Sequence, residues 1–409
     1  MADDAPSSRY PVFPMMWVMC FFLGLSPGFW GAALTNILNA KGLGEWITLA
    51  FMVSPCAAMV SPLIAGALAD QRIRAERLLG IIAMTSAGLL LVAFWSLDHG
   101  WNTWWFIGFL ALHALFAGPM WGLGTMVALT HLKHGERQFP LVRLGGTIGW
   151  MVAGLATSYL LHGDRSSTSG YASVITRVML GLIAFLLPAT HPTSKSRSWT
   201  SLLGLEAFSL LKERDHFVFF LTTALLSVPM SAFYMFVPRH LEALGDLHAS
   251  GTMTLGQWSE VGAMVFVGAV MARCRVKTVL IWALGLTLAR FVCFTVAGAN
   301  SVRGWLIAGV SLHGIAYTFY FITAQIFLDR RVPPGLRGQA QGLLTLMSAG
   351  VGTLTGTLFV GYLYRLAVIG GSGGWTLFWA VLSGILLLCL VIFATLYKGV
   401  TANEAPAEK

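Results

Sequence analysis

Long apolar runs alternate with short polar segments along almost the whole chain. A helix that crosses a bilayer needs about 20 predominantly apolar residues, and twelve runs reach that length. They cover residues 12–34, 46–69, 78–97, 103–130, 139–161, 172–190, 215–238, 252–272, 277–297, 304–328, 337–364 and 374–397. The pattern predicts an all-α membrane protein with twelve transmembrane helices.

A polar stretch divides these runs six and six. Within it, TSLLGLEAFSLL carries apolar residues at helical spacing between basic flanks, which is typical of a helix lying on the membrane surface. We expect an N-terminal six-helix bundle over residues 1–191, a cytoplasmic linker with a surface helix over residues 192–214, and a C-terminal bundle and tail over residues 215–409.

Short similar segments, here called echoes, occur at matching places in the two halves. GALADQRIR follows the second run and resembles GAVMARCR after the eighth, while PLVRLGG opens the fifth run much as PGLRGQ opens the eleventh. A parallel repeat about an axis along the membrane normal places such echoes at matching positions. The echoes therefore favour two pseudo-symmetric bundles, as in the major facilitator fold.

Composition supports the membrane assignment. Only 11% of the 409 residues are charged and 56% are apolar, whereas soluble domains are about 25% charged. The net charge of +9 does not indicate a nucleic-acid partner, because 18 of the 26 Lys and Arg residues fall on one predicted side and six on the other. Among those six is Arg177. The bias of cytoplasmic loops toward Lys and Arg then predicts that both termini are cytoplasmic.

Two further features narrow the class. The five cysteines show neither a disulfide framework nor zinc-ligand spacing, and no metal or other cofactor is expected. The opening MADDAPSSRY lacks the basic start of a signal peptide, so the first run should remain as a helix. No HExxH, Walker lysine loop, GxSxG or selectivity-filter motif is present. The sequence therefore predicts neither an enzyme nor an ion channel.

One acid, Glu260, lies inside a predicted span. A lone carboxyl in hydrocarbon favours its neutral form, and such a group can take up and release a proton. Gln257 lies one helical turn earlier on the same face, so the pair suits a ligand that both donates and accepts hydrogen bonds. Alternatively, Glu260 is a protonated structural residue or lies near the outer surface, and Gln257 makes an interhelical hydrogen bond.

Polar and aromatic residues also share one face of the fifth run. Arg143 and Thr147 are four residues apart, and Trp150 follows three later. Arg143 can bind an acid or a ligand oxygen, or extend to the inner surface. Trp150 can stack on a flat ring or simply pack.

Similar pairs occur in the second half. His313 and Tyr317 share a face of the tenth run, and Ser231 and Tyr234 lie three apart after Pro229 in the seventh. Arg290, in the ninth run, has no partner that the sequence reveals.

The chain resembles a known family: the nucleoside–proton symporters of the major facilitator superfamily. The likeness rests on FPLVRLGGTIGW (139–150), GQWSE (256–260), LHGIAYTFYFITAQIFLD (312–329) and QGL (341–343). GALADQRIR also resembles a degraded form of the superfamily's gating motif, with Asp70 and Arg74 at its acidic and basic positions.

The resemblance implies roles for these residues. Gln257 and Glu260 would contact ribose or base, and Glu260 would couple the proton. The other implied substrate-binding residues are Arg143, Thr147, Trp150, Ser231, Tyr234, His313 and Tyr317. Two departures stand out: Thr318 occupies a position where known members carry an acid, and His313 one where a tyrosine can occur.

The expected function is proton-coupled nucleoside uptake by alternating access. The expected partners are a small-molecule substrate (a nucleoside), a proton and the lipid bilayer, and the protein would act as a monomer in a bacterial inner membrane. Two alternatives remain: a symporter of a sugar or another small polar metabolite, and a non-transporting membrane receptor or intramembrane enzyme.

Overall fold

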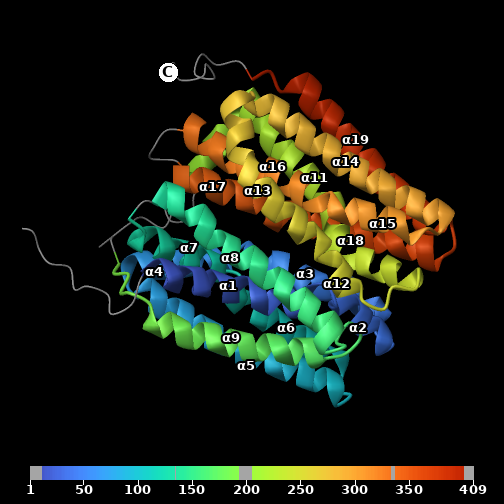
Figure 1. Ribbon diagram of the computed structural model, residues 1–409, viewed down its shortest axis with the longest axis horizontal. Helices are drawn as coiled ribbons and strands as arrows, with labels where there is room; N and C mark the ends of the chain where they lie inside the picture. The colour runs from blue at the N-terminus through green and yellow to red at the C-terminus, as the bar shows by residue number, and fades with distance from the viewer. Residues whose placement is uncertain (1–11, 134, 193–204, 333–336, 400–409) are drawn as a thin grey trace, which may run out of the picture. The chain divides into compact units, whose positions relative to one another are not determined.

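The computed structural model describes residues 12–133, 135–192, 205–332 and 337–399, and throughout these ranges the regular structure is helical (Figure 1). Nine helical segments in this part of the chain are long and apolar enough to cross a membrane. They are Val12–Ala40, Ala75–Asp98, Thr103–His131, Thr168–Leu186, Arg214–Ala243, Val276–Asn300, Arg303–Gln325, Gly342–Ile369 and Gly374–Leu396. Each corresponds to one of the twelve runs predicted from the sequence, so an all-α membrane fold is confirmed.

The other three predicted runs are also helical, but they are interrupted or carry charge. The second is divided into α3 (Ile47–Ala58) and α4 (Ser61–Gln71), with Pro62 in the first turn of α4, where its missing N–H is tolerated. The fifth forms α8 (Gly135–Leu155), which begins with GERQ, and the eighth forms α12 (Ala249–Met253) and α13 (Leu255–Arg273), which contains GQWSE.

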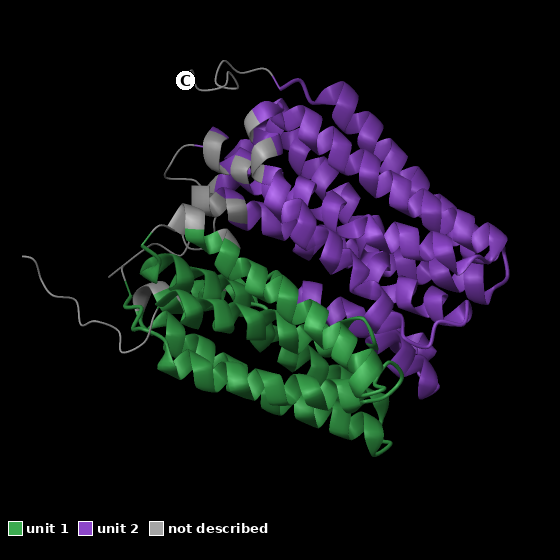
Figure 2. Cartoon of the chain, in the orientation of Figure 1, with its two compact units in different colours: residues 1–33, 57–197 green, residues 34–56, 198–409 purple. Residues whose placement is uncertain are grey.

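The chain falls into two compact units (Figure 2). Unit 1 comprises residues 1–33 and 57–197, and unit 2 comprises residues 34–56 and 198–409. In addition to α4 and α8, unit 1 holds α1 (Val12–Gly31), α5 (Ala75–Asp98), α6 (Thr103–Ala117), α7 (Met120–His131), the π-helical turn η2 (Ala156–Leu160) and α9 (Thr168–Leu186).

Unit 2 holds the remaining elements. Besides α12, α13 and most of α3, they are α2 (Leu34–Ala40), η1 (Gly44–Trp46), η3 (Leu205–Lys212), α11 (Arg214–Ala243), α14 (Val276–Asn300), α15 (Arg303–Ser311), α16 (His313–Arg331), α17 (Arg337–Thr345), η5 (Leu346–Gly352), α18 (Thr353–Tyr364), η6 (Arg365–Ile369) and α19 (Gly374–Leu396). η3, a 3₁₀ helix, lies in the expected linker, of which residues 193–204 are outside the described ranges.

Glycines allow α1 and α8 to pack backbone against backbone in unit 1. A Cβ on Gly24 would collide with the carbonyl of Gly146, and one on Gly149 would collide with the carbonyl of Phe21. Lipid provides no hydrophobic driving force between helices, so helices in a membrane associate through close packing. Small residues at such positions allow this close packing. This contact fixes the face of α8 that carries the candidate residues.

One placement made from the sequence is wrong. Arg177 was assigned to the outer side, but it lies within α9 and is buried. Its Nε donates to Ser26 Oγ at 3.0 Å and its Nη1 to Ser86 Oγ at 3.2 Å. The two hydroxyls satisfy a buried cation that the linear sequence suggests should be near water.

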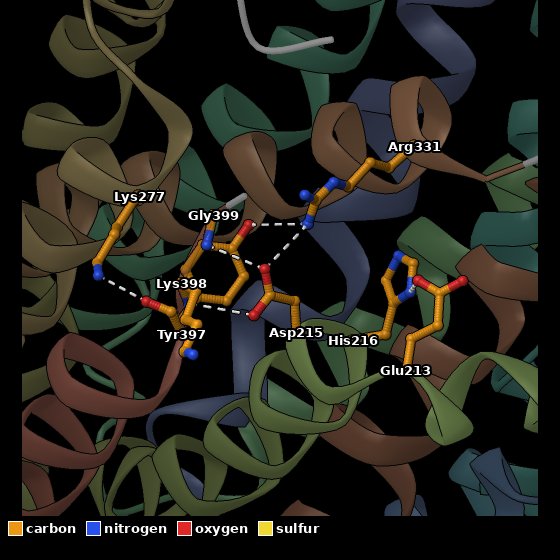
Figure 3. Close-up of polar contacts among 8 residues, drawn as sticks. All are labelled: Glu213, Asp215, His216, Lys277, Arg331, Tyr397, Lys398 and Gly399. Atoms are coloured by element: carbon orange, nitrogen blue, oxygen red, sulfur yellow. Dashed lines mark hydrogen bonds and ion pairs between the residues drawn. The ribbon is translucent and has the colours of Figure 1, made fainter. Parts of the chain in front are cut away.

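The end of unit 2 is tied back to the start of α11 (Figure 3). The Asp215 carboxylate accepts hydrogen bonds from the backbone amides of Lys398, at 3.1 Å, and Gly399, at 2.9 Å. Arg331 Nη1 lies 3.6 Å from Asp215 Oδ2 and donates to the Tyr397 hydroxyl at 3.4 Å. The segment after α19 is therefore anchored by charge-assisted hydrogen bonds.

Candidate functional site

The carboxyl and the amide predicted from GQWSE lie early in α13. Gln257 is buried and Glu260 is half-buried. Gln257 Nε2 donates to the Tyr234 hydroxyl of α11 at 3.3 Å, and Tyr234 interacts electrostatically with Glu260. Two helices thus bring an amide, a phenol and a carboxyl together, a set that can both donate and accept hydrogen bonds.

The contact between α13 and α16 is set by glycine. A Cβ on Gly314 would meet the backbone nitrogen of Glu260 and the carbonyl of Gly256. The Gly314 amide also donates to Ser259 Oγ at 3.0 Å. The α16 backbone therefore lies directly against the turn of α13 that carries Glu260.

This approach places the aromatic residues of α16 in the same cluster. His313 is buried, and its ring stacks on Phe233 of α11 with centroids 4.1 Å apart and planes 15° apart. Tyr317 lies 5.7 Å from the His313 ring and interacts electrostatically with Tyr234. Five of the six candidates that unit 2 contributes, Tyr234, Gln257, Glu260, His313 and Tyr317, thus form one polar and aromatic cluster.

Ser231 is positioned differently. Its hydroxyl donates to the Val228 carbonyl within α11 at 2.7 Å, and it faces Gly356 of α18, where a Cβ would lie 2.7 Å from Ser231 Oγ. The structure uses this hydroxyl in helix packing and does not join it to the cluster by any bond among the described residues.

The candidates of unit 1 lie along one face of α8. The Arg143 guanidinium carbon is 5.0 Å from the centre of the Trp121 ring of α7, a cation–π contact. Thr147 and Trp150 are half-buried, and the Trp150 indole packs against Gly31 of α1. Trp150 is thus partly occupied by packing, one of the two interpretations left open by the sequence.

Of the predicted gating pair, Asp70 and Arg74, the structure describes the side chain of Arg74. Arg74 Nε lies 2.9 Å from Glu76 Oε1, and the other carboxylate oxygen accepts the Thr190 amide at 2.9 Å. Glu76 is 2% exposed. The Asp70 side chain lies outside the described parts of the chain. Arg74 therefore pairs with an acid two residues away that the sequence analysis did not assign to it.

Arg290 is the residue whose position the sequence did not explain. It is fully buried in α14, and its Nη1 donates to His313 Nδ1 at 2.6 Å. The signal was a lone arginine in the middle of an apolar run, but its partner lies 23 residues further along the chain and becomes visible only once α14 packs on α16. Within the described residues no group of His, Cys, Asp and Glu is arranged to hold a metal ion.

Comparison with known proteins decides the family. The model of the family described as nucleoside H+ symporter matches residues 13–402. The chain is 31% identical to YegT of Escherichia coli (strain K12), covering 97% of this chain and 95% of that protein, and 28% identical to the xanthosine permease of the same organism, covering 95% and 96%. This chain belongs to the nucleoside H+ symporter family.

The fold agrees with this membership. The crystal structure of the nucleoside transporter NupG superposes with a TM-score of 0.81 at 23% identity, covering 95% of this chain and all of that one. This protein therefore has the major facilitator fold.

At Thr318, where the sequence departs from the family pattern, the buried hydroxyl has no hydrogen-bond partner among the described residues.

Proposed function

We propose that this protein imports a nucleoside together with a proton by alternating access. The observation that carries the proposal is the cluster on unit 2 of a nucleoside H+ symporter family member, where Glu260 and Gln257 meet Tyr234 beside the aromatic residues of α16. A ribose presents hydroxyls and a base presents a flat ring with donors and acceptors. Amide, phenol and carboxyl groups next to aromatic rings match both.

Each residue has a distinct proposed role. Glu260 binds and releases the coupled proton and contacts the ribose or base, and Gln257 and Tyr234 hydrogen-bond the substrate. Tyr317 and Trp150 offer rings for stacking. The remaining substrate-binding candidates are Arg143, Thr147, Ser231 and His313, and Asp70 and Arg74 are proposed to act at a gate.

The setting of this activity is also part of the proposal. We infer twelve membrane helices in two bundles, residues 1–191 and 215–409, joined by a cytoplasmic linker over residues 192–214, with both termini cytoplasmic. The excess of Lys and Arg on one side of the membrane supports this orientation. Relatives from Escherichia coli are named as permeases, which supports a membrane transporter that is not an enzyme. That it acts as a monomer in a bacterial inner membrane is part of the same proposal.

The test is uptake by the purified protein in lipid vesicles. Radiolabelled uridine or adenosine is offered with and without an inward proton gradient, to wild type and to Glu260→Gln. We expect the gradient to accelerate uptake by wild type and to have no effect on Glu260→Gln. Gradient-independent uptake by wild type contradicts proton coupling, and competition by sugars but not nucleosides contradicts the substrate class.

A further inference from the structure

Arg290 is a fully buried side chain of α14 that bonds to a residue of the candidate site. Its Nη1 donates to His313 Nδ1, at the start of α16, at 2.6 Å, and its Nε and Nη2 have no hydrogen-bond partner among the described residues. Arginine inside a membrane-spanning helix is rare and marks functional positions. The contact with His313 therefore points to a role for Arg290 in that site.

This bond decides which ring nitrogen of His313 carries the proton. A guanidinium has donors and no acceptor, so Nδ1 must be the acceptor. An imidazolium carries hydrogens on both nitrogens and cannot accept, so the ring is neutral while the bond is made. The proton of the neutral ring is then on Nε2. His313 is thus a donor at Nε2 and cannot become an acceptor there as long as Arg290 occupies Nδ1.

The orientation of the His313 ring is fixed as well. Its face stacks on Phe233 of α11, with centroids 4.1 Å apart and planes 15° apart. The Arg290 guanidinium carbon lies 4.6 Å from the centre of the same Phe233 ring, a cation–π contact that holds the guanidinium in place. At the ring edge, a Cβ on Gly256 of α13 would lie 3.2 Å from His313 Cδ2. Contacts from α11, α13 and α14 therefore hold the ring in one orientation.

The Nε2 of His313 remains available to a ligand. His313 is 3% exposed, and its Nε2 has no hydrogen-bond partner among the described residues. The ring's other aromatic neighbours are Tyr234, edge-on with centroids 6.1 Å apart, and Tyr317, 5.7 Å away. Both tyrosines belong to the cluster proposed to bind the substrate. A buried donor without a partner is costly, and an acceptor atom of a ligand would remove that cost.

The other polar groups of the cluster are less restricted than His313. The Tyr234 hydroxyl can donate or accept, and the Gln257 side chain carries both donors and an acceptor. These groups suit either an oxo or an amino group on a base. His313 offers a donor alone at Nε2. It is therefore the group that can distinguish a carbonyl oxygen from an amino group at the same position of a base.

We propose that Arg290 is a positioning residue for substrate selection: it keeps the His313 proton on Nε2, which donates to a carbonyl oxygen of the nucleoside base. This selection rests on the proposed function and defines its substrate class, nucleosides of oxo bases such as uracil and hypoxanthine over those of amino bases such as cytosine and adenine. An amino group opposite Nε2 would bring two donors face to face and leave both unpaired. The aromatic rings around His313 favour the flat base over the ribose at this point.

The test compares nucleosides that exchange an oxo group for an amino group. Binding of uridine against cytidine, and of inosine against adenosine, is measured on the purified full-length protein without a proton gradient. We expect wild type to bind the oxo member of each pair at least about tenfold more tightly. Arg290→Met should reduce this ratio to about threefold or less, because a neutral His313 can then also accept at Nε2. Arg290→Lys, which again offers only donors, should keep the preference.

A double-mutant cycle separates positioning from folding. His313→Phe keeps an aromatic ring next to Phe233 and removes the Nε2 donor, so it should lose the preference as Arg290→Met does. Adding Arg290→Met to His313→Phe should change the ratio no further, and this double variant leaves neither partner buried alone. Arg303→Met, at an exposed position on α15, should bind like wild type.

Three binding results overturn the proposal. The first is equal affinity of wild type for the oxo and amino members, and the second is a wild-type ratio in Arg290→Met. The third is an equal loss of affinity for both members in Arg290→Met that disappears with 3′-deoxynucleosides, because it would assign the His313 hydrogen bond to a ribose oxygen.

Nitrogen NMR of histidine-labelled protein reads the tautomer directly. Protonated and unprotonated ring nitrogens resonate apart, and the His313 signals are identified among the ten histidines by their loss in the double variant. We expect the proton on Nε2 in wild type and in Arg290→Lys, and a mixture of both tautomers in Arg290→Met. A proton on Nδ1 in wild type overturns the proposal even where Arg290→Met does not fold.

These measurements distinguish failure of the selection from failure of the proposed function. If the protein binds oxo nucleosides with the Arg290 dependence described but its uptake ignores the proton gradient, the proton coupling fails and the selection stands. If uptake is coupled to protons while the preference is absent or insensitive to Arg290, the selection fails and the proposed function stands.

Discussion

Gly314 and Ser259 join two helices at the candidate site, with the Gly314 amide donating to Ser259 Oγ at 3.0 Å. The bond leaves the usual intrahelical pattern at the first turn of α16, where amides have no partner within their own helix. It fixes the position of His313 relative to Glu260, because each is the immediate neighbour of one of the two bonded residues. The glycine makes this possible, since any side chain would separate the backbones.

Gly314→Ala should therefore damage both stability and transport. The added Cβ would collide with the backbone of α13 at Glu260 and Gly256, and overpacking of this kind costs about 1–3 kcal/mol. We expect a lower Tm for the purified protein and a loss of most nucleoside uptake.

The matched control is Gly262→Ala, on α13 itself. The added Cβ there has no neighbour within 4 Å, and alanine is the better helix former. Its Tm and uptake should equal or exceed those of wild type. Equal behaviour of the two variants would show that the close approach of α13 and α16 is not required.

Tyr234→Phe should weaken substrate binding and leave proton coupling intact. The phenol accepts the Gln257 amide at 3.3 Å, and a neutral hydrogen bond contributes about 0.5–1.5 kcal/mol. Without it Gln257 loses its fixed orientation, so the Kd for uridine or adenosine should rise about threefold to tenfold. Gradient stimulation should persist because Glu260 is unchanged.

Binding is measured by scintillation proximity on the purified protein, with uptake in vesicles as the second readout. Tyr362→Phe, at an exposed position on α18, is the control and should bind like wild type. A variant at Tyr234 that binds normally but no longer responds to the gradient would assign the phenol to the proton pathway instead.

The helices could be predicted from the sequence, whereas the pairing of charges could not. Apolar runs give the spans because lipid demands long apolar helices. Arg177 was misplaced and Arg290 left unassigned because hydropathy describes each residue by its own chain neighbours. Their partners lie on different helices: Ser26 of α1 and Ser86 of α5 for Arg177, and His313 of α16 for Arg290.

Side-chain roles depend on the same non-local contacts. Gln257 and Glu260 could be placed on one face of a helix from their spacing alone. Tyr234 accepts a hydrogen bond from the Gln257 amide, whereas the Ser231 hydroxyl is bonded within its own helix. The difference depends on which face of α11 lies against α13 and which lies against α18. The sequence spacing of Ser231 and Tyr234 is equally consistent with either assignment.

Glu76→Gln should destabilise unit 1. The carboxylate is buried, lies 2.9 Å from Arg74 Nε and accepts the Thr190 amide, so it links the α4–α5 turn to the segment after α9. Arg74 is 29% exposed, which reduces the contribution of the ion pair, and we expect a loss of about 1–2 kcal/mol.

This loss is read as a lower Tm in a thermal-unfolding assay of the purified protein. The neighbouring Arg77 is exposed, and Arg77→Gln should leave the Tm unchanged. If Glu76→Gln keeps the Tm of wild type but changes the rate of uptake, the pair acts in gating and contributes little to stability.

Asp215→Asn should release the segment that follows α19. Asp215 accepts the amides of Lys398 and Gly399 with its two carboxylate oxygens and lies near Arg331 (Figure 3). An asparagine offers a single acceptor oxygen and no charge, so at least one charge-assisted bond is lost, with a free-energy change of about 1.5–3 kcal/mol. Amide hydrogen exchange at Lys398 and Gly399 should accelerate about tenfold or more.

The control lies two residues earlier in the same turn. Glu213 is largely exposed and contacts His216 at 2.9 Å, so Glu213→Gln removes a neighbouring negative charge without touching the anchored segment and should leave exchange at both amides slow. Uptake need not change in either variant. Unaltered exchange in Asp215→Asn would mean that the contact of Lys277 Nζ with the Tyr397 carbonyl holds the segment by itself.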